Sequence, residues 1–345
     1  MRRRRMAAIS MNPALGYQIG NDHQNHGMVV EQIEGLIKVY KDGHVERPPI
    51  VPMVACTVSL ECGVICKDVV IDTSSNVWAR VYVPKSQGHH PLLVYFHGGG
   101  FCVGSASWSC YHEFLAKLAS ISCSVIISVN YRLAPENRLP AAYEDGFKAL
   151  MWVKQQALNR SNDQRWWCSQ CNFSKVFLAG DSAGANIAHN IATRAGSQTN
   201  NLSPLYLKGT ILIQPYFGGE ERTYSEKNMV QPPNSALSLT ASDVYWRLSL
   251  PVGSNRNNPW CNPLAKGATR LEDLKLPPTM VCISEMDILK DRNIEFCNAM
   301  NRAGKKVEHV LYTGVGHAFQ VLHNSKLSQP RTNEMMYHIN GFINR

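Results

Sequence analysis

Short apolar segments alternate with longer segments of helical periodicity over most of the chain. Residues 92–96 are all apolar, which is typical of a strand buried on both faces. Strands that alternate with helices predict an α/β protein whose mostly parallel sheet is covered on both faces. The pattern predicts strands at 77–83, 92–96, 124–131, 174–179, 207–214, 279–286 and 307–312, and helices at 109–121, 141–157, 183–195, 289–303 and 330–343.

Two regions depart from this alternation. Residues 1–27 are rich in Gly, Asn, His and Gln and show little periodicity, so they are predicted to be a disordered tail. Residues 28–38 carry apolar positions at helical spacing, which predicts a helix, and residues 40–47 resemble a hairpin turn. Between residues 215 and 251, a polar loop with prolines leads into an aromatic, helix-like segment at 238–250.

The composition is that of a globular protein, with 44% hydrophobic and 18% charged residues. A chain of 345 residues allows two domains, but α/β domains of this size commonly fold as one. A single domain over residues 28–345 is therefore predicted. No apolar run approaches the roughly 18 residues of a membrane span, so no membrane segment is expected.

Charge and cysteine content narrow the classes of function and the expected location. The formal net charge is +9, to which arginines at residues 2–5 contribute four. We interpret this start as an upstream extension, with an organelle presequence as the alternative, because no apolar segment of a secretory signal follows. The basic residues elsewhere lack interleaved aromatics, which argues against a nucleic-acid surface.

Eleven cysteines, several within apolar strands, indicate reduced thiols and a cytoplasmic or nuclear protein. The lone C-x-x-C at 168–171 lacks a second ligand pair, so no metal site is predicted.

The sequence Gly-Asp-Ser-Ala-Gly at 180–184 carries the strongest chemical signal. It is a G-x-S-x-G motif between a predicted strand and an Ala-rich predicted helix. A serine on such a sharp turn exposes its hydroxyl above the sheet edge, and the glycines leave room for the turn. The N–H of Ala183, at the start of the helix, can then stabilise a developing negative charge.

Three further features support nucleophilic catalysis by Ser182. His-Gly-Gly-Gly at 97–100 follows a predicted strand and supplies backbone N–H groups for an oxyanion hole. Asp287 ends the apolar run 279–286, and His317 lies in a Gly-rich segment after the last predicted strand. The order Ser, Asp, His is that of the α/β-hydrolase fold.

These residues predict a catalytic triad, because a serine hydroxyl needs a base and the base needs an orienting partner. Ser182 is the predicted nucleophile, His317 the general base and acid, and Asp287 the orienting carboxylate. Glu285 and Asp291 are alternatives to Asp287, which we favour because it directly ends its strand. The predicted oxyanion hole takes its N–H donors from Gly99, Gly100 and Ala183, with Gly98 permitting the turn; His97 is expected to brace this loop.

The chain resembles plant carboxylesterases of the hormone-sensitive-lipase-like group of α/β-hydrolases. The resemblance covers residues 28–343. It departs at Ala185, where many members carry glycine. The motifs that carry it are His-Gly-Gly-Gly-Phe at 97–101, Tyr-Arg-Leu-Ala-Pro-Glu at 131–136, Gly-Asp-Ser-Ala-Gly at 180–184, Asp-Ile-Leu-Lys-Asp at 287–291 and Gly-His-Ala-Phe at 316–319.

The resemblance implies an esterase that acts through an acyl-enzyme on small to medium apolar esters, without a cofactor. It also implies a cap formed by the N-terminal segment (about 28–45) and an insertion (about 216–250). Lactone-bearing plant hormones are possible substrates within the family, and residues 218–223 and 246–251 look like features of that neighbourhood. A gibberellin-type receptor is one alternative, although such receptors lose the histidine that this chain keeps as His317. A lyase or acyl transferase using the same site is another.

Aromatic residues near these motifs have two interpretations. They either line an acyl or alcohol pocket or pack within the core and the cap. The residues are Trp108, Tyr216, Phe217, Tyr245 and Trp246. The sequence leaves the oligomeric state and the physiological substrate open.

Overall fold

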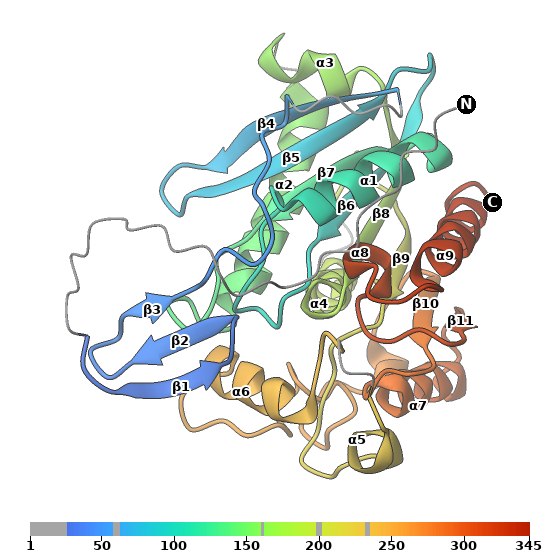
Figure 1. Cartoon of the computed structure of the whole chain (residues 1–345). Helices are drawn as coiled ribbons and strands as arrows, with labels where there is room; N and C mark the ends of the chain where they lie inside the picture. Colours follow the sequence, from blue (N-terminus) through green and yellow to red (C-terminus); the bar gives the residue numbers. More distant parts are fainter. Residues whose placement is uncertain (1–25, 58–62, 160–161, 198–201, 232–234) are drawn as a thin grey trace, which may run out of the picture.

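An eight-stranded, mostly parallel sheet forms the centre of the molecule (Figure 1). A computed structural model describes residues 26–57, 63–159, 162–197, 202–231 and 235–345. The strand order is β11-β10-β9-β8-β6-β7-β5-β4, and only the β4–β5 and β5–β7 pairs are antiparallel. The strands are β4 (Val64–Asp72), β5 (Val77–Pro84), β6 (His90–Phe96), β7 (Val125–Asn130), β8 (Cys171–Asp181), β9 (Leu207–Ile213), β10 (Thr279–Ser284) and β11 (Val307–Tyr312).

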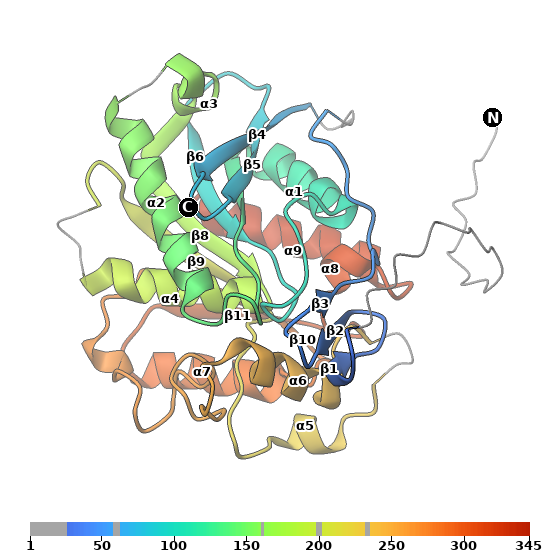
Figure 2. The same cartoon turned by 90° about the vertical axis from the view of Figure 1, so that its left-hand side faces the viewer.

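Helices cover both faces of this sheet, as the alternation in the sequence predicts (Figure 2). Successive residues of β6 point to opposite faces, so Leu93 joins a core with α1 and α9, whereas Val94 joins a core with α2 and α4. The helices around the sheet are α1 (Ser109–Ser122), α2 (Ala141–Asn159), α3 (Arg165–Cys168), α4 (Ala183–Ser197), α7 (Lys290–Arg302), α8 (Phe319–Leu322) and α9 (Ser328–Ile343). Among the described residues, no helix combines the length and apolar character that a membrane crossing requires.

The N-terminal segment is a small antiparallel sheet, so the predicted helix at 28–38 is wrong. Its strands are β1 (Val29–Ile33), β2 (Ile37–Tyr40) and β3 (Val45–Glu46), in the order β1-β2-β3. Gly35 has a φ of +71°, which suits the turn between β1 and β2 and would interrupt a helix. Residues 1–25, which include most of the predicted tail, lie outside the described residues.

The segment between β9 and β10 carries two more helices, α5 (Tyr224–Asn228) and α6 (Leu239–Ser249). Ser238 caps α6, because its hydroxyl accepts a hydrogen bond from the N–H of Ala241 at 3.1 Å. α6 lies beside the N-terminal sheet in both views, and the ion pair between Arg247 and Glu31 (2.7 Å) joins them (Figures 1 and 2).

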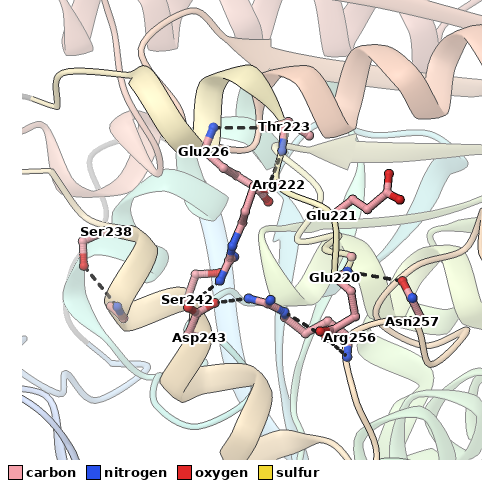
Figure 3. Close-up of polar contacts among 12 residues, drawn as sticks. Glu220, Glu221, Arg222, Thr223, Glu226, Ser238, Ser242, Asp243, Arg256 and Asn257 are labelled. Atoms are coloured by element: carbon pink, nitrogen blue, oxygen red, sulfur yellow. Dashed lines mark hydrogen bonds and ion pairs between the residues drawn. The ribbon is translucent and has the colours of Figure 1, made fainter.

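Ion pairs fix α6 to the loops on either side of it (Figure 3). Asp243 of α6 accepts hydrogen bonds from Arg222, at 2.6 Å, and from Arg256. Glu220 accepts a hydrogen bond from the backbone N–H of Arg256 at 2.8 Å. The loop at 218–223, which the sequence singled out, therefore holds α6 in place.

A buried ion pair fixes α5 to α7. Arg292 lies 3.1 Å from Glu226, and the two side chains are 9% and 4% exposed. Glu226 also completes a capping box with Thr223 at the start of α5. Because α7 begins just after Asp287, this pair links the insertion to the loop that carries that aspartate.

Candidate active site

Ser182 lies at the sharp turn between β8 and α4. Its φ is +52°, in the left-handed region that non-glycine residues rarely adopt. The glycines on either side are required by close backbone approach. A Cβ on Gly184 would lie 1.9 Å from the carbonyl oxygen of Phe96, and one on Gly180 would lie 2.3 Å from the carbonyl carbon of Gly184. The turn therefore presents Ser182 at the carboxyl edge of the sheet.

The structure brings Ser182, His317 and Asp287 into one hydrogen-bonded chain. The Ser182 Oγ lies 2.9 Å from His317 Nε2, and His317 Nδ1 lies 2.7 Å from Asp287 Oδ2. All three side chains are buried. An ionised carboxylate can only accept, so Nδ1 carries the proton and Nε2 is left to accept one from the serine.

The neighbouring acidic residues have other partners. Asp291 accepts a hydrogen bond from the N–H of Ser225 at 2.6 Å, and Glu285 accepts one from the N–H of Gly314 at 2.8 Å. Asp287 itself also accepts a hydrogen bond from the N–H of Leu289, through Oδ1 at 3.0 Å. The structure therefore places Asp287, and neither alternative, against the imidazole.

The glycine loop after β6 faces the serine. Gly99 and Gly100 line the same cavity as Ser182 and have φ values of +114° and +58°. In the described part of the chain, the N–H groups of Gly99, Gly100 and Ala183 donate to no protein acceptor. The N–H of Gly98 already donates to the hydroxyl of Tyr111 (2.8 Å) and to Oδ1 of Asp181 (3.0 Å).

Asp181, inside the serine motif, received no role from the sequence. Its Oδ1 accepts hydrogen bonds from the N–H of Gly98 at 3.0 Å and from the hydroxyl of Tyr95 at 2.8 Å, and its Oδ2 accepts from Tyr111 at 2.9 Å. Burial raises its pKa to about 6, against the opposing effect of the tyrosine hydroxyls. Asp181 thus joins the serine turn to the glycine loop. An acidic residue within the motif was the only signal for it in the sequence.

His97 braces the glycine loop. Its Nδ1 lies 2.8 Å from the carbonyl oxygen of Gly98, and its ring stacks on Tyr131 at a centroid distance of 4.4 Å. Burial lowers the pKa of His97 to about 4, so the ring is neutral at physiological pH. Its position fits a structural role.

A cavity of about 100 Å³ opens over Ser182 and His317. Trp108, Tyr216 and Tyr245 line it, whereas Phe217 and Trp246 are absent from the lining. Trp246 stacks behind Tyr216 at a centroid distance of 4.4 Å, and Phe217 packs against the α7 side of the core. The other lining side chains are mostly apolar, among them Leu36, Ile50, Val103, Ala236, Leu237, Val321 and Leu322.

Charged groups are scarce at this cavity. Among the described residues, Asp181 and His317 are the only ionisable lining residues besides tyrosine and cysteine, and the lining includes no lysine or arginine. Within the same residues, no group of three or more His, Cys, Asp or Glu side chains is arranged to hold a metal ion. The described part of the lining is therefore mostly uncharged.

Comparisons with known proteins agree with the fold. Residues 93–321 match the alpha/beta hydrolase fold family. The chain is 50% identical over 328 residues to probable carboxylesterase 6 of Arabidopsis thaliana, covering 94% of each chain. It is 34% identical over 297 residues to a gibberellin receptor of the same plant, covering 82% of this chain and 81% of the receptor. A solved esterase of Pyrobaculum calidifontis superposes with a TM-score of 0.67 at 28% identity, covering 81% and 84%.

The chain therefore belongs to the α/β-hydrolase family. Within that family it belongs to the group that contains the plant carboxylesterases and the gibberellin receptors.

Proposed function

We propose that this protein is a serine carboxylesterase that hydrolyses small to medium apolar esters. The observation that carries the proposal is the continuous hydrogen-bonded chain from Asp287 through His317 to Ser182. A protein that only binds its ligand needs no base in contact with a serine, so this arrangement favours catalysis over a receptor function. The identity to a carboxylesterase, higher than that to a gibberellin receptor, supports the same choice.

The first half of the reaction makes an acyl-enzyme. Ser182 Oγ attacks the ester carbonyl carbon while its proton passes to His317 Nε2, and Asp287 stabilises the imidazolium that forms. The carbonyl oxygen becomes an oxyanion, which the free N–H groups of Gly99, Gly100 and Ala183 stabilise. Each such donor is worth about 3 kcal/mol in the transition state. The alcohol then leaves with the proton from His317, so no charge remains on the acyl-serine.

The second half releases the acid. His317 takes a proton from a water molecule, which attacks the acyl carbon. The second oxyanion then accepts hydrogen bonds from the same N–H groups as the first. Collapse of this intermediate breaks the bond to Ser182 Oγ and returns the proton to it. The N-terminal sheet and α6 act as a cap over the site in this proposal, because Leu36 and Tyr245 both reach the cavity lining.

The apolar lining selects for uncharged substrates. An unpaired charge brought into such a lining loses several kcal/mol of hydration. The acidic lining residue, Asp181, is a poor partner for a cation, because its carboxylate already accepts hydrogen bonds from Tyr95, Tyr111 and the N–H of Gly98. We therefore expect the purified protein to hydrolyse a neutral ester such as p-nitrophenyl butyrate. Its kcat/KM should exceed, by about tenfold or more, those for a hemisuccinate ester and for butyrylcholine. A preference for either charged ester would contradict this substrate class.

The catalytic assignment has its own control. Ser182→Ala should lower turnover by about a million-fold, because the hydroxyl is the group replaced. Equal melting temperatures of the variant and the wild type would show that the fold is intact. A folded variant that still hydrolyses p-nitrophenyl butyrate at the wild-type rate would refute the proposed function.

A further inference from the structure

Residues 213–216, at the end of β9 and just after it, contact the serine turn, the histidine loop and β10, the strand that precedes Asp287. The carbonyl oxygen of Ile213 accepts a hydrogen bond from the N–H of Ser182 at 2.8 Å, and the N–H of Tyr216 donates to the carbonyl oxygen of Ser182 at 3.0 Å. Because β9 lies between β8 and β10, this segment lies between the strands that carry the serine and the aspartate. It received no catalytic assignment from the sequence.

Gln214 reaches the loop that carries the histidine. Its Oε1 accepts a hydrogen bond from the N–H of Ala318, the residue after His317, at 2.7 Å. Its Nε2 donates to the hydroxyl of Ser284, at the end of β10, at 2.6 Å. The orientation of the amide is settled by its partners, since the N–H of Ala318 can only donate.

The backbone explains why this contact matters. Ala318 has a φ of +57°, a left-handed conformation that costs a non-glycine residue about 1–2 kcal/mol. Gln214 itself has a φ of +47° and is fully buried, and its own N–H donates to the carbonyl oxygen of Cys282 at 2.8 Å. A buried hydrogen bond from Gln214, whose own backbone is tied to β10, therefore holds Ala318, and with it the direction in which the imidazole of His317 points.

The loop before His317 is held separately. The N–H of Met286 donates to the carbonyl oxygen of Val315 at 3.0 Å, and Glu285 accepts from the N–H of Gly314. On the other side of His317, Gln214 supplies the contact to the N–H of the next residue. Losing it would remove the tie between Ala318 and the residue after β9, while the hydrogen bonds that join Ala318 to α8 would remain.

We infer that Gln214 is a positioning residue for His317, acting through the N–H of Ala318. This inference rests on the proposed function, because a positioned base matters only if the serine reacts. Gln214 does not touch the reacting atoms, so its effect should fall on turnover and leave substrate binding nearly unchanged.

The test compares three variants by kcat, KM and melting temperature. Gln214→Met removes both hydrogen bonds at nearly constant size, Gln214→Glu keeps an acceptor for Ala318, and Ser284→Ala removes the other partner alone. Misplacing a catalytic group by about 1 Å costs on the order of 100-fold. We therefore expect Gln214→Met to lower kcat by about 10- to 100-fold, with KM changed less than about threefold. Gln214→Glu should lose less than about tenfold, and Ser284→Ala less than Gln214→Met.

Three results would overturn the inference. The first is a kcat within about threefold of wild type for Gln214→Met. The second is an equal loss in Ser284→Ala, which would place the effect on general packing. The third, decisive if Gln214→Met does not fold, is a loss of more than about tenfold in Gln214→Glu at the wild-type melting temperature.

A separate readout distinguishes this inference from the proposed function. If the wild type hydrolyses no ester, the proposed function fails. Proton NMR of the ring N–H of His317 then tests whether Gln214 positions the imidazole. The proton shared with Asp287 should resonate far downfield in the wild type, and the signal should shift or broaden in Gln214→Met. An unchanged resonance in that variant would overturn the positioning role.

Discussion

Asp287→Asn tests the direction of the hydrogen bonds in the site. In the wild type, Oδ1 accepts from the N–H of Leu289 and Oδ2 accepts from His317 Nδ1. The asparagine oxygen should keep the N–H of Leu289, which can only donate, so its NH₂ group would face the imidazole. Nδ1 would then have to accept, and the ring proton would move to Nε2. In that tautomer His317 cannot take the proton of Ser182.

The expected loss is therefore large although the change in shape is small. A wrong tautomer in a comparable triad lowers kcat by about 10⁴-fold. That factor corresponds to about 5.4 kcal/mol of transition-state stabilisation. KM should change little, because Asp287 lies behind the imidazole and is absent from the cavity lining.

Steady-state hydrolysis of p-nitrophenyl butyrate measures this loss, and Asp291→Asn is its matched control. Asp291 accepts a hydrogen bond from the backbone N–H of Ser225, and an asparagine oxygen can accept the same bond. We expect the control to stay within about threefold of wild type. A kcat for Asp287→Asn within about 100-fold of wild type, or an equal loss in both variants, would refute the reasoning.

Three further predictions concern stability, the glycine loop and pH. Arg292→Met should lower the unfolding free energy measured in urea by about 3–5 kcal/mol, because Glu226 is left buried and unpaired, and adding Glu226→Gln should restore part of it. Gly100→Ala should lower kcat by about 100-fold or more, since the added Cβ would lie 2.4 Å from the ring of Tyr245; an unchanged kcat would contradict that contact. Burial raises the pKa of Asp181 from an ordinary 3.8 to about 6, so its protonation contributes stability that is complete below pH 3.8 and is lost as the pH rises from there through 6. The melting temperature of wild type minus that of Asp181→Asn should therefore be larger at pH 5 than at pH 8, and an equal difference would argue against the raised pKa.

The central strands and the candidate triad could be predicted because their signals are local. Apolar runs such as 92–96 are buried on both faces, and Ser182, Asp287 and His317 each follow such a run or a strand-like segment closely. Parallel strands bring their carboxyl ends to one edge, so residues far apart in the chain meet there.

The N-terminal strands and β4 depend on pairing with other segments, which the local sequence pattern does not reveal. The segment at 28–38 has apolar spacing that suits a helix. It forms two strands instead, because β1 and β2 pair with each other across the turn at Gly35. The sequence pattern does not predict β4, because this strand lies at the exposed edge of the sheet and carries charged residues that interrupt its apolar pattern. One of them, Asp68, pairs with Arg80 of β5.

The roles of individual side chains were hardest to predict. Phe217 and Trp246 are aromatic like the residues that line the cavity, yet they pack behind it. Gln214 carries no chemical signal in the sequence, because its importance arises from a contact to Ala318, which lies on a different loop.

Covalent labelling tests the central claim, an acyl-enzyme on Ser182, most directly. The wild type should react with an organophosphate such as diethyl p-nitrophenyl phosphate, and activity should fall in proportion to the label bound. Mass spectrometry of the digested protein should find one label per chain, on the peptide that contains Ser182, and none on Ser182→Ala. A label on another residue, or an active protein that takes up no label, would contradict the account.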